Sequence, residues 1–348
     1  MQVFEEVPLA PYTTFQIGGP ARWFAEAASE DDIAAGIAFA RERGLPLFVL
    51  GGGSNLLVSD AGFSGLVLRI ALRGIAATRE NGRTIVSAAA GEDWDGLVAY
   101  AVAEACAGVE CLSGIPGTVG GTPVQNVGAY GQEVSQTIVT VRGFDRQTGQ
   151  FRDLPASACG FSYRRSIFNS TERDRYIVSR VDYALHTDRP ASVAYADLSR
   201  YFTARGVLTP TLSEVREAVR TIRAQKGMLL VAGDADCRSA GSFFKNPIVP
   251  VTVLDSLAAE LGVEKQTIPA YPAQPGQVKL SAAWLIERAG FAKGYALGNA
   301  GISSRHTLAL INRGGATARE VLALRDQVIE AIWSRFAVRL EPEPVWLG

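Results

Sequence analysis

Histidine is nearly absent from this sequence, which has only His186 and His306 among its 348 residues. A histidine-based zinc site or a Ser-His-Asp triad is therefore poorly supported, because each depends on histidine at the reacting centre. The cysteines form no CxxC pair and no cluster with metal-ligand spacing, so we expect free buried thiols in a reducing compartment and no metal site. These cysteines are Cys106, Cys111, Cys159 and Cys237.

Long apolar runs and an excess of either charge are also missing. No stretch approaches the roughly 18 consecutive apolar residues of a membrane span. The net charge is only −1, so there is no global basic field to recruit nucleic acid or an anionic membrane. Residues 1–18 contain Glu5, Glu6, Pro8 and Pro11 and lack the apolar segment of a signal peptide. We therefore expect a cytoplasmic protein with no nucleic-acid or membrane partner. A monomer is expected as well, although nothing in these features determines the oligomeric state.

The length and the hydrophobic pattern predict more than one domain of mixed helix and strand. The 348 residues exceed the ~250–300 at which a single core stops growing, so two or three domains are expected. Spacing and capping signals predict helices over residues 29–43, 93–105, 213–225, 281–289 and 318–336. Short apolar runs predict strands over residues 45–50, 66–70, 84–88, 138–143, 175–183 and 337–340.

Glycine is plentiful, and a first cluster, residues 51–55 (Gly-Gly-Gly-Ser-Asn), follows a predicted strand. Successive backbone N–H groups without a shielding Cβ can form a nest for a phosphate. The cluster is not a Walker A loop, because no Gly-Lys-Ser/Thr follows. The dinucleotide fingerprint G-x-G-x-x-G also fails, since Asn55 and Leu56 stand after Gly53. A plain tight turn remains an alternative.

A second glycine loop, residues 114–131, has six glycines and two prolines but no charged residue. A solvent-facing linker would be richer in Ser, Lys and Glu. We therefore interpret this stretch as an ordered loop packed against something flat or anionic, with a purely structural loop between sheets as the alternative.

Three further segments carry polar side chains in patterns that suit a reacting centre. Residues 238–247 place the hydroxyl of Ser242 after a small-residue bend and ahead of two phenylalanines and Lys245. Residues 159–168 place Arg164 and Arg165 between aromatics, and an arginine fork binds a carboxylate in bidentate fashion. Residues 340–343 hold two glutamates in an extended, proline-stiffened stretch. The alternatives are a turn into a buried strand, a solvated arginine pair and a solvated acidic tail.

Taken in order from residue 13 to residue 343, these segments resemble the MurB family of flavoenzymes. The resemblance implies an α+β protein: an FAD-binding fold of the vanillyl-alcohol-oxidase/MurB type with two α+β subdomains, followed by a C-terminal α/β substrate-binding domain. The domains it implies are residues 1–72 with 344–348, residues 73–231 and residues 232–343. Tyr195 matches the loop tyrosine of the longer, type I subtype; a core aromatic is the alternative for this residue.

The resemblance also implies roles for individual residues. Its catalytic residues would be Arg164, Ser242 and Glu343. The residues that it implies for FAD are Gly51, Gly52, Gly53, Ser54, Asn55, Ile115, Pro116, Gly117, Gly120, Gly121, Gln125, Asn126, Gly128, Ala129 and Tyr130. Those for the substrate or the NADPH phosphates are Tyr195, Lys226, Asn246, Tyr271 and Lys279.

The implied activity is NADPH-dependent reduction of UDP-N-acetylglucosamine enolpyruvate to UDP-N-acetylmuramate, in peptidoglycan precursor synthesis. A hydride passes through flavin N5 to C3, Ser242 protonates C2, and Arg164 and Glu343 stabilise an enolate-like intermediate. The lack of histidine before His186 favours noncovalent FAD, and His306 is interpreted as a pocket or structural residue. A flavin oxidase and a non-enzymatic nucleotide sensor are the rival readings.

Three positions depart from the family pattern. Thr13 stands where asparagine is more usual, Lys226-Gly227-Met228 replaces a Lys-Leu-Pro, and Pro344 follows Glu343. Proline removes a ladder donor, so the geometry around Glu343 is less certain from sequence than that around Ser242.

Overall fold

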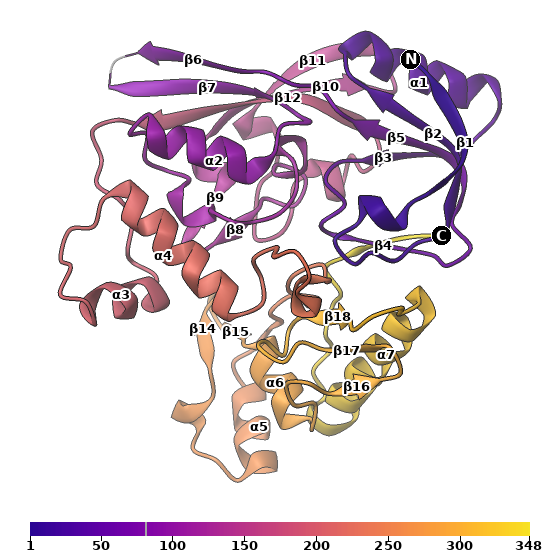
Figure 1. Cartoon of the computed structure of the whole chain (residues 1–348). Helices are drawn as coiled ribbons and strands as arrows, with labels where there is room; N and C mark the ends of the chain where they lie inside the picture. Colours follow the sequence, from indigo (N-terminus) through magenta and orange to yellow (C-terminus); the bar gives the residue numbers. More distant parts are fainter. Residues whose placement is uncertain (81) are drawn as a thin grey trace. The chain divides into compact units, whose positions relative to one another are not determined.

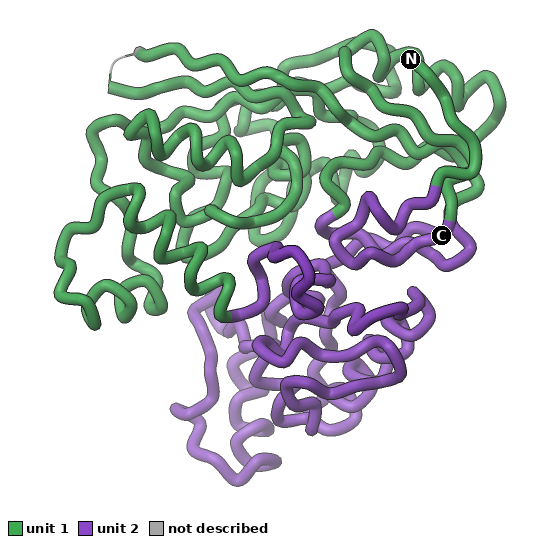
Figure 2. Tube along the Cα trace, in the orientation of Figure 1, with its two compact units in different colours: residues 1–7, 20–53, 63–225 green, residues 8–19, 54–62, 226–348 purple. Residues whose placement is uncertain are grey.

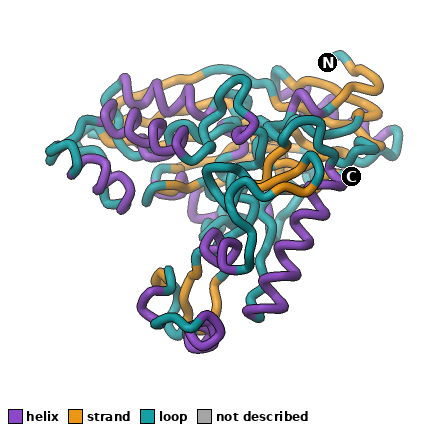
Figure 3. Tube along the Cα trace, turned by 60° about the horizontal axis from the view of Figure 1, so that its bottom comes forward, coloured by secondary structure: helices purple, strands orange, loops and turns teal. Residues whose placement is uncertain are grey.

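The computed structural model describes residues 1–80 and 82–348 and contains helices, strands and long loops (Figures 1 and 3). Contacts divide the chain into two compact units (Figure 2). Unit 1 comprises residues 1–7, 20–53 and 63–225, and unit 2 comprises residues 8–19, 54–62 and 226–348. The mixed α+β class is confirmed, whereas the finer division into three domains, with boundaries at residues 72 and 231, stays a prediction.

A four-stranded sheet in unit 1 contains the strand that precedes the first glycine cluster. Its strands, in the order β1-β2-β5-β3, are β1 (Val3–Pro8), β2 (Pro20–Ala27), β5 (Phe63–Ile70) and β3 (Leu47–Leu50). Both β2 and β3 pair with β5 in parallel, which requires a crossover, and helix α1 (Glu30–Glu42) supplies it. The predicted N-cap Ser29 begins this helix in a capping box with Asp32.

An antiparallel five-stranded sheet forms the other half of unit 1. Its order is β11-β10-β12-β7-β6, with β12 in the centre and largely buried on both faces. The chain reaches the second glycine loop through helix α2 (Trp94–Ala103), which Asp93 caps. The strands are β6 (Ile75–Glu80), β7 (Arg83–Ala89), β10 (Ile138–Asp145), β11 (Gln150–Pro155) and β12 (Tyr176–His186).

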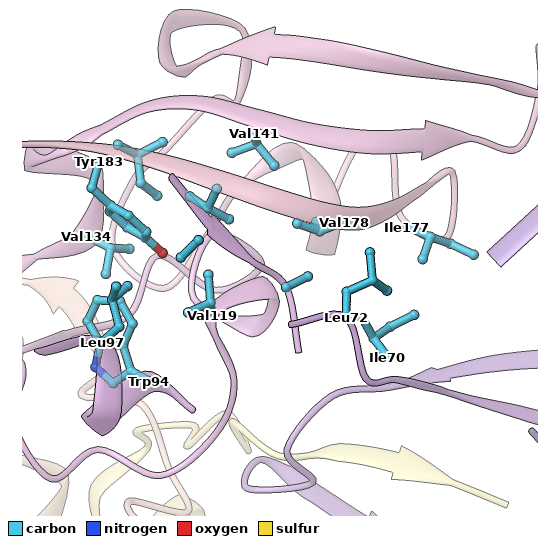
Figure 4. Close-up of a cluster of buried hydrophobic side chains, with 14 of the residues drawn as sticks. Ile70, Leu72, Trp94, Leu97, Val119, Val134, Val141, Ile177, Val178 and Tyr183 are labelled. Carbon is cyan, nitrogen blue, oxygen red and sulfur yellow. The ribbon is translucent and has the colours of Figure 1, made fainter. Parts of the chain in front are cut away.

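The core of unit 1 lies under the second glycine loop and anchors it. Figure 4 shows Tyr183 of β12 pointing toward Trp94 and Leu97 of α2, and the Trp94 and Tyr183 ring centroids are 5.8 Å apart. The Trp94 indole N–H donates to the Leu112 carbonyl (3.1 Å), and the Tyr183 hydroxyl bonds that of Thr122 (2.7 Å). The indole N–H and the phenol hydroxyl therefore bond residues of the second glycine loop or of the segment just before it. These two bonds hold the loop against the core.

Two further helices and a short hairpin complete unit 1. Helix α4 (Leu212–Gln225) buries Val215, Val219 and Ile222, the face that its spacing predicts. The remaining elements are β8 (Gly128–Ala129), β9 (Gln132–Glu133) and α3 (Ala196–Thr203).

Unit 2 combines short sheets with three helices around its own apolar core. Strands β4 (Leu56–Val58) and β19 (Val345–Leu347) pair in parallel. Helix α7 (Ala318–Phe336) begins with the predicted Thr317–Glu320 capping box. The other elements are β13 (Ile248–Pro250), β14 (Ala270–Pro272), β15 (Gln277–Leu280), β16 (Ala296–Leu297), β17 (Ala300–Ile302), β18 (Leu310–Asn312), α5 (Val253–Leu261) and α6 (Ala282–Arg288).

One predicted strand, over residues 337–340, is wrong. Ala337 adopts a left-handed conformation (φ 52°) that ends α7, and the last strand of the chain is β19 instead. Val338 and Leu340 are buried in the unit 2 core. The alternation of apolar and polar residues here therefore reflects the packing of an irregular segment and not strand pairing.

All four cysteines are free and buried, as predicted. Among the helices that the structure describes, none combines the length and the apolar character needed to cross a membrane.

Candidate functional site

Ser242 lies at the edge of a buried aromatic pair in unit 2. The Phe243 N–H donates to the Leu308 carbonyl (2.7 Å), and the Phe243 carbonyl accepts the Glu343 N–H (2.9 Å). Phe243 and Phe244 are only 2% and 1% exposed. The backbone that carries Ser242 is therefore held on both sides, and its position is set by burial of the rings that follow it.

The same pairing brings Glu343 next to Ser242 along the chain register. Phe244 faces Pro342 in an antiparallel bridge, so Glu343 lies opposite Phe243, one position from Ser242. Asn55 adds a bond from its side-chain amide to the Glu343 carbonyl (3.2 Å).

Pro344 does not loosen this arrangement. The next backbone donor, the Val345 N–H, bonds the Asn55 carbonyl (2.9 Å), so the proline lies between two anchored residues. Glu341, the other glutamate of the segment, is 70% exposed and pairs with Lys245 (Oε1–Nζ 2.6 Å).

A tight bend before Ser242 leaves its hydroxyl available. Gly241 has φ 68°, a conformation that favours glycine, and its N–H donates to Ser239 Oγ (3.2 Å). The hydroxyl of Thr14 donates to the Ser239 carbonyl (2.6 Å). The half-buried Ser242 side chain makes no hydrogen bond within the described part of unit 2, so its hydroxyl remains for a ligand.

In unit 1, Arg164 and Arg165 have different surroundings. Residues 162–165 form a tight turn in which Arg164 takes φ 54°. The Arg164 guanidinium donates to the Gly128 carbonyl of the second glycine loop (2.7 Å), whereas Arg165 is exposed. Ser166 bonds the Val124 carbonyl of the same loop (2.6 Å). The solvated-pair alternative therefore describes Arg165 only.

The second glycine loop is held by its own asparagine. Asn126 is fully buried, and its amide donates to the Ser162 carbonyl (3.0 Å) and to Glu133 Oε2 (2.9 Å). Its side-chain oxygen accepts the Ser135 N–H (3.1 Å). This loop is thus ordered and packed, as its lack of charge predicts.

Close approach of neighbouring atoms explains one glycine in each loop, Gly52 and Gly120. A Cβ on Gly52 would lie 2.6 Å from the Gly117 Cα, and one on Gly120 would lie 2.6 Å from the Ala90 Cβ. Real Cβ atoms do not approach so closely, so glycine at position 52 lets the two glycine loops touch within unit 1, and glycine at position 120 lets the second loop pack on Ala90. Gly53 has φ 62°, and the chain enters unit 2 directly after it, at Ser54.

Tyr195 packs on Tyr130, at the end of the second glycine loop. The two rings meet edge to face with centroids 5.4 Å apart, and Tyr195 is 43% exposed, so it is not a core aromatic. Burial raises the pKa of Tyr130 to about 12, an effect that the charge of Arg223 opposes. The phenol of Tyr130 is therefore uncharged at neutral pH, and the exposed ring of Tyr195 packs against it.

The predicted substrate residues of unit 2 are distributed over several elements. Tyr271 and Lys279 are direct register partners in β14 and β15, and Tyr271 is exposed. Asn246 Oδ1 accepts the Ala282 N–H (2.9 Å) and so caps α6. Gly227, beside Lys226, has φ 65°, and its Cβ would lie 3.0 Å from the Asp236 Cβ. The departure at Lys226-Gly227 is thus a left-handed turn that requires glycine.

His306 has a structural role. Its Nδ1 accepts the Leu308 N–H (3.1 Å), which shapes the turn whose carbonyl binds Phe243. The interpretation of His306 as structural is consistent with this contact.

Known proteins are similar to this chain over nearly its whole length. Residues 21–154 match the FAD binding domain family, and residues 233–347 match the C-terminal domain of UDP-N-acetylenolpyruvoylglucosamine reductase. The chain is 48% identical over 349 residues to the UDP-N-acetylenolpyruvoylglucosamine reductase of Thermobifida fusca, covering 98% of this chain and 97% of that protein. The enzyme of the same name from Streptomyces coelicolor is 46% identical and is matched over 100% of this chain and 91% of its own. The chain belongs to the MurB family.

A solved MurB agrees in fold. The crystal structure of MurB from Thermus caldophilus aligns over 100% of both chains with a TM-score of 0.66 and 26% identity. This MurB family member is a flavin oxidoreductase whose cofactor is FAD.

The residues of unit 1 fit a dinucleotide cofactor. Two glycine loops meet backbone to backbone, so their N–H groups can approach phosphates closely. The hydroxyl of Thr118, in the second loop and facing Gly51 of the first, is buried and has no hydrogen-bond partner in the described structure. A flavin dinucleotide supplies the phosphate oxygens that such donors lack.

Sequence reasoning missed two buried polar residues of this MurB family member, one that bonds the second glycine loop and one that bonds the segments beside it. Arg223 of α4 is 8% exposed and donates to the Gly114 carbonyl (3.0 Å). Glu110 is fully buried and accepts N–H groups from Gly108 (2.7 Å), Gln132 (2.9 Å) and Ser192 (3.0 Å). The sequence contains one signal for Glu110, a single acidic residue within an apolar run. It contains none for Arg223, which does not differ from a solvent-exposed arginine on a helix.

Asp95 is the centre of another missed cluster. It accepts from Arg216 (2.5 Å), from Arg220 and from the Gly114 N–H (2.6 Å), so it ties α2 and α4 to the start of the second glycine loop. Burial alone would raise the pKa of Asp95, but the hydrogen bonds from Arg216 and Gly114 and the two arginine charges outweigh it and hold the pKa below its ordinary value.

Replacing Asp95 with asparagine is expected to lower the stability of unit 1 by about 1–3 kcal/mol at pH 7. Because the folded pKa is depressed, this contribution is complete above the unfolded pKa of about 3.9 and is lost as the pH falls through the folded value. The gap in thermal midpoint between wild type and Asp95→Asn should therefore narrow at acid pH.

The matched control is Asp153→Asn. Asp153 also faces two arginines, Arg142 and Arg180, but is 51% exposed, so its loss should cost well under about 1 kcal/mol. Equal effects of the two substitutions, or a gap for Asp95 that does not change with pH, would contradict the assignment.

Proposed function

We propose that this protein catalyses the NADPH-dependent reduction of UDP-N-acetylglucosamine enolpyruvate to UDP-N-acetylmuramate, in peptidoglycan precursor synthesis. The observation that carries the proposal is the similarity of the chain, over nearly its full length and at 48% and 46% identity, to two proteins named for this reductase activity. The anchored, adjacent Ser242 and Glu343 and the loop-bound Arg164 support it independently. When bound by the two glycine loops, FAD would supply the relay that carries hydride from NADPH to C3 of the enolpyruvyl group.

Arg164 binds the substrate carboxylate in this proposal. An enol ether accepts hydride only if its carboxylate draws charge away, and a guanidinium fork stabilises that charge in bidentate geometry. Such a preorganised donor typically contributes ~3–4 kcal/mol to transition-state stabilisation. The guanidinium already donates to a backbone carbonyl, so it is oriented in advance. Glu343 stabilises the same enolate-like intermediate, for which it must be protonated or bonded to a donor.

Ser242 protonates C2. A serine hydroxyl is a weak acid and needs a group that replaces its proton. Lys245, three residues along, is paired with Glu341, which favours water as that proton source.

The remaining predicted residues bind the nucleotide and its phosphates. Asn246 has committed its oxygen to α6, so its amide N–H groups remain for a ligand. Tyr271 and Lys279, side by side in β14 and β15, offer a ring and a cation. We assign Tyr195 and Lys226 to the same substrate and to the NADPH phosphates, and we place the enzyme in the cytoplasm, where these soluble nucleotides are its substrates.

An anaerobic absorbance titration of the purified protein tests the proposal. Yellow protein should bleach with NADPH and recolour on addition of UDP-N-acetylglucosamine enolpyruvate. Protein that recolours only with oxygen would instead be a flavin oxidase. Colourless protein that FAD does not reconstitute would overturn the flavoenzyme assignment as well.

A further inference from the structure

The tight turn that carries Arg164 has a backbone conformation that side chains disfavour. The Arg165 N–H donates to the Ser162 carbonyl (3.0 Å) and closes a four-residue turn over residues 162–165. Arg164 is the third residue of this turn and has φ 54°, although such a position usually holds glycine or asparagine. A residue in this conformation persists where further contacts hold it, so the turn needs support from outside itself.

Asn169 supplies such a contact. It ends the short 3-10 helix Ile167–Asn169, and its side-chain amide N–H donates to the Arg164 carbonyl (3.1 Å). The oxygen of the same amide accepts the Ser166 N–H (3.0 Å). The Asn169 side chain therefore bonds the residues on both sides of Arg165 and fixes the peptide group that follows Arg164.

The neighbouring hydroxyl groups use their protons elsewhere. The Ser166 hydroxyl donates to the Val124 carbonyl (2.6 Å), which anchors the segment to the second glycine loop. The Ser170 hydroxyl donates to the Ser166 carbonyl. Neither proton is left for the Arg164 carbonyl, and the bond to that carbonyl comes from Asn169.

We propose that Asn169 is a positioning residue for the reduction, which directs the Arg164 guanidinium toward the substrate carboxylate by holding the Arg164 backbone. The guanidinium itself donates to the Gly128 carbonyl (2.7 Å), so a contact at each end of the residue determines where the fork lies. A bidentate bond to a carboxylate depends on the direction of the fork, so a backbone that can relax should weaken it. The inference rests on the proposed function, because it takes Arg164 as the residue that binds the carboxylate.

Asn169→Ala tests the inference in the full-length, FAD-loaded protein. Recolouring by UDP-N-acetylglucosamine enolpyruvate should slow about five- to tenfold, as for the loss of one hydrogen bond, while NADPH bleaching keeps its wild-type rate. Asn169→Asp keeps the oxygen that accepts the Ser166 N–H but lacks the donor to the Arg164 carbonyl. It should slow recolouring at least as much, and it provides the second measurement if Asn169→Ala does not fold.

The same substitution in an Arg164→Ala background separates positioning from a general effect on the fold. With no guanidinium to direct, Asn169→Ala should change the recolouring rate by less than about twofold. A purely structural role would slow recolouring equally in the two backgrounds and would slow NADPH bleaching as well.

Ser170→Ala is the matched control, because it removes a bond in the same segment that reaches Ser166 and not Arg164. It should leave the ratio of the two half-reaction rates unchanged. Wild-type recolouring in both Asn169 variants, or an equal loss with and without Arg164, would overturn this inference alone. Failure of the wild-type protein to recolour with the substrate would instead overturn the proposed function on which it rests.

Discussion

The Ser242→Ala variant is expected to bleach with NADPH at the wild-type rate and to recolour with the enolpyruvyl substrate at least ~100-fold more slowly. Only the second half-reaction needs a proton at C2, so loss of the hydroxyl should leave the first half-reaction unaffected. The fold should tolerate the change, because the Ser242 side chain makes no hydrogen bond within the described part of unit 2 and the backbone is held by Phe243. Stopped-flow absorbance of the flavin measures both half-reactions on one sample.

NADPH bleaching of the same sample is the internal control for FAD content and folding. Ser239→Ala, in the same segment, removes a hydroxyl that only shapes the bend at Gly241. It should slow the two half-reactions by similar, small factors. Equal loss of both half-reactions in Ser242→Ala would refute the proton-donor role.

The Arg164→Ala variant is expected to lose ~10²–10³-fold in the rate of the second half-reaction and to bind the substrate more weakly, with NADPH bleaching little changed. The guanidinium is the only part of the side chain that the proposal uses, and lysine lacks its fork. Arg164→Lys should therefore recover charge but not the full rate. Rapid-mixing kinetics at several substrate concentrations separate binding from chemistry.

Two controls isolate the side chain from its backbone. Arg165→Ala removes the exposed neighbour and should behave as wild type. Arg164→Gly removes the same guanidinium as Arg164→Ala but relieves the positive φ, which costs a non-glycine residue about 1 kcal/mol. The two Arg164 variants should react alike while the glycine variant is more stable. A slow second half-reaction in Arg165→Ala, or full activity in Arg164→Ala, would contradict the assignment.

Sequence signals within a few residues of each other correctly predicted where two helices begin and that the second glycine loop is ordered. The Ser29 and Thr317 capping boxes begin α1 and α7 where their spacing indicates, and the uncharged glycine loop is ordered and packed. Apolar alternation was misleading at residues 337–340, because burial alone produces the same pattern as a strand.

Long-range pairs could not be predicted. Asp95 meets arginines more than a hundred residues away, and nothing in the local sequence distinguishes them from solvated side chains. Thr118 is an ordinary residue of a glycine loop until the loop is seen to leave its hydroxyl without a partner. The cap that Asn246 provides for α6 depends on a helix that begins 36 residues later.

The chain passes between its units five times, after residues 7, 19, 53, 62 and 225. Strand β19 therefore pairs with β4, and Phe15 packs in the same core as α7, although most of the sequence lies between the two members of each pair. A recombination event near codon 226 would exchange most of unit 2 while leaving residues 8–19 and 54–62 from the other parent. Exchange of one whole unit by a single recombination event is therefore disfavoured. We expect the separate segments of each unit to change together during evolution.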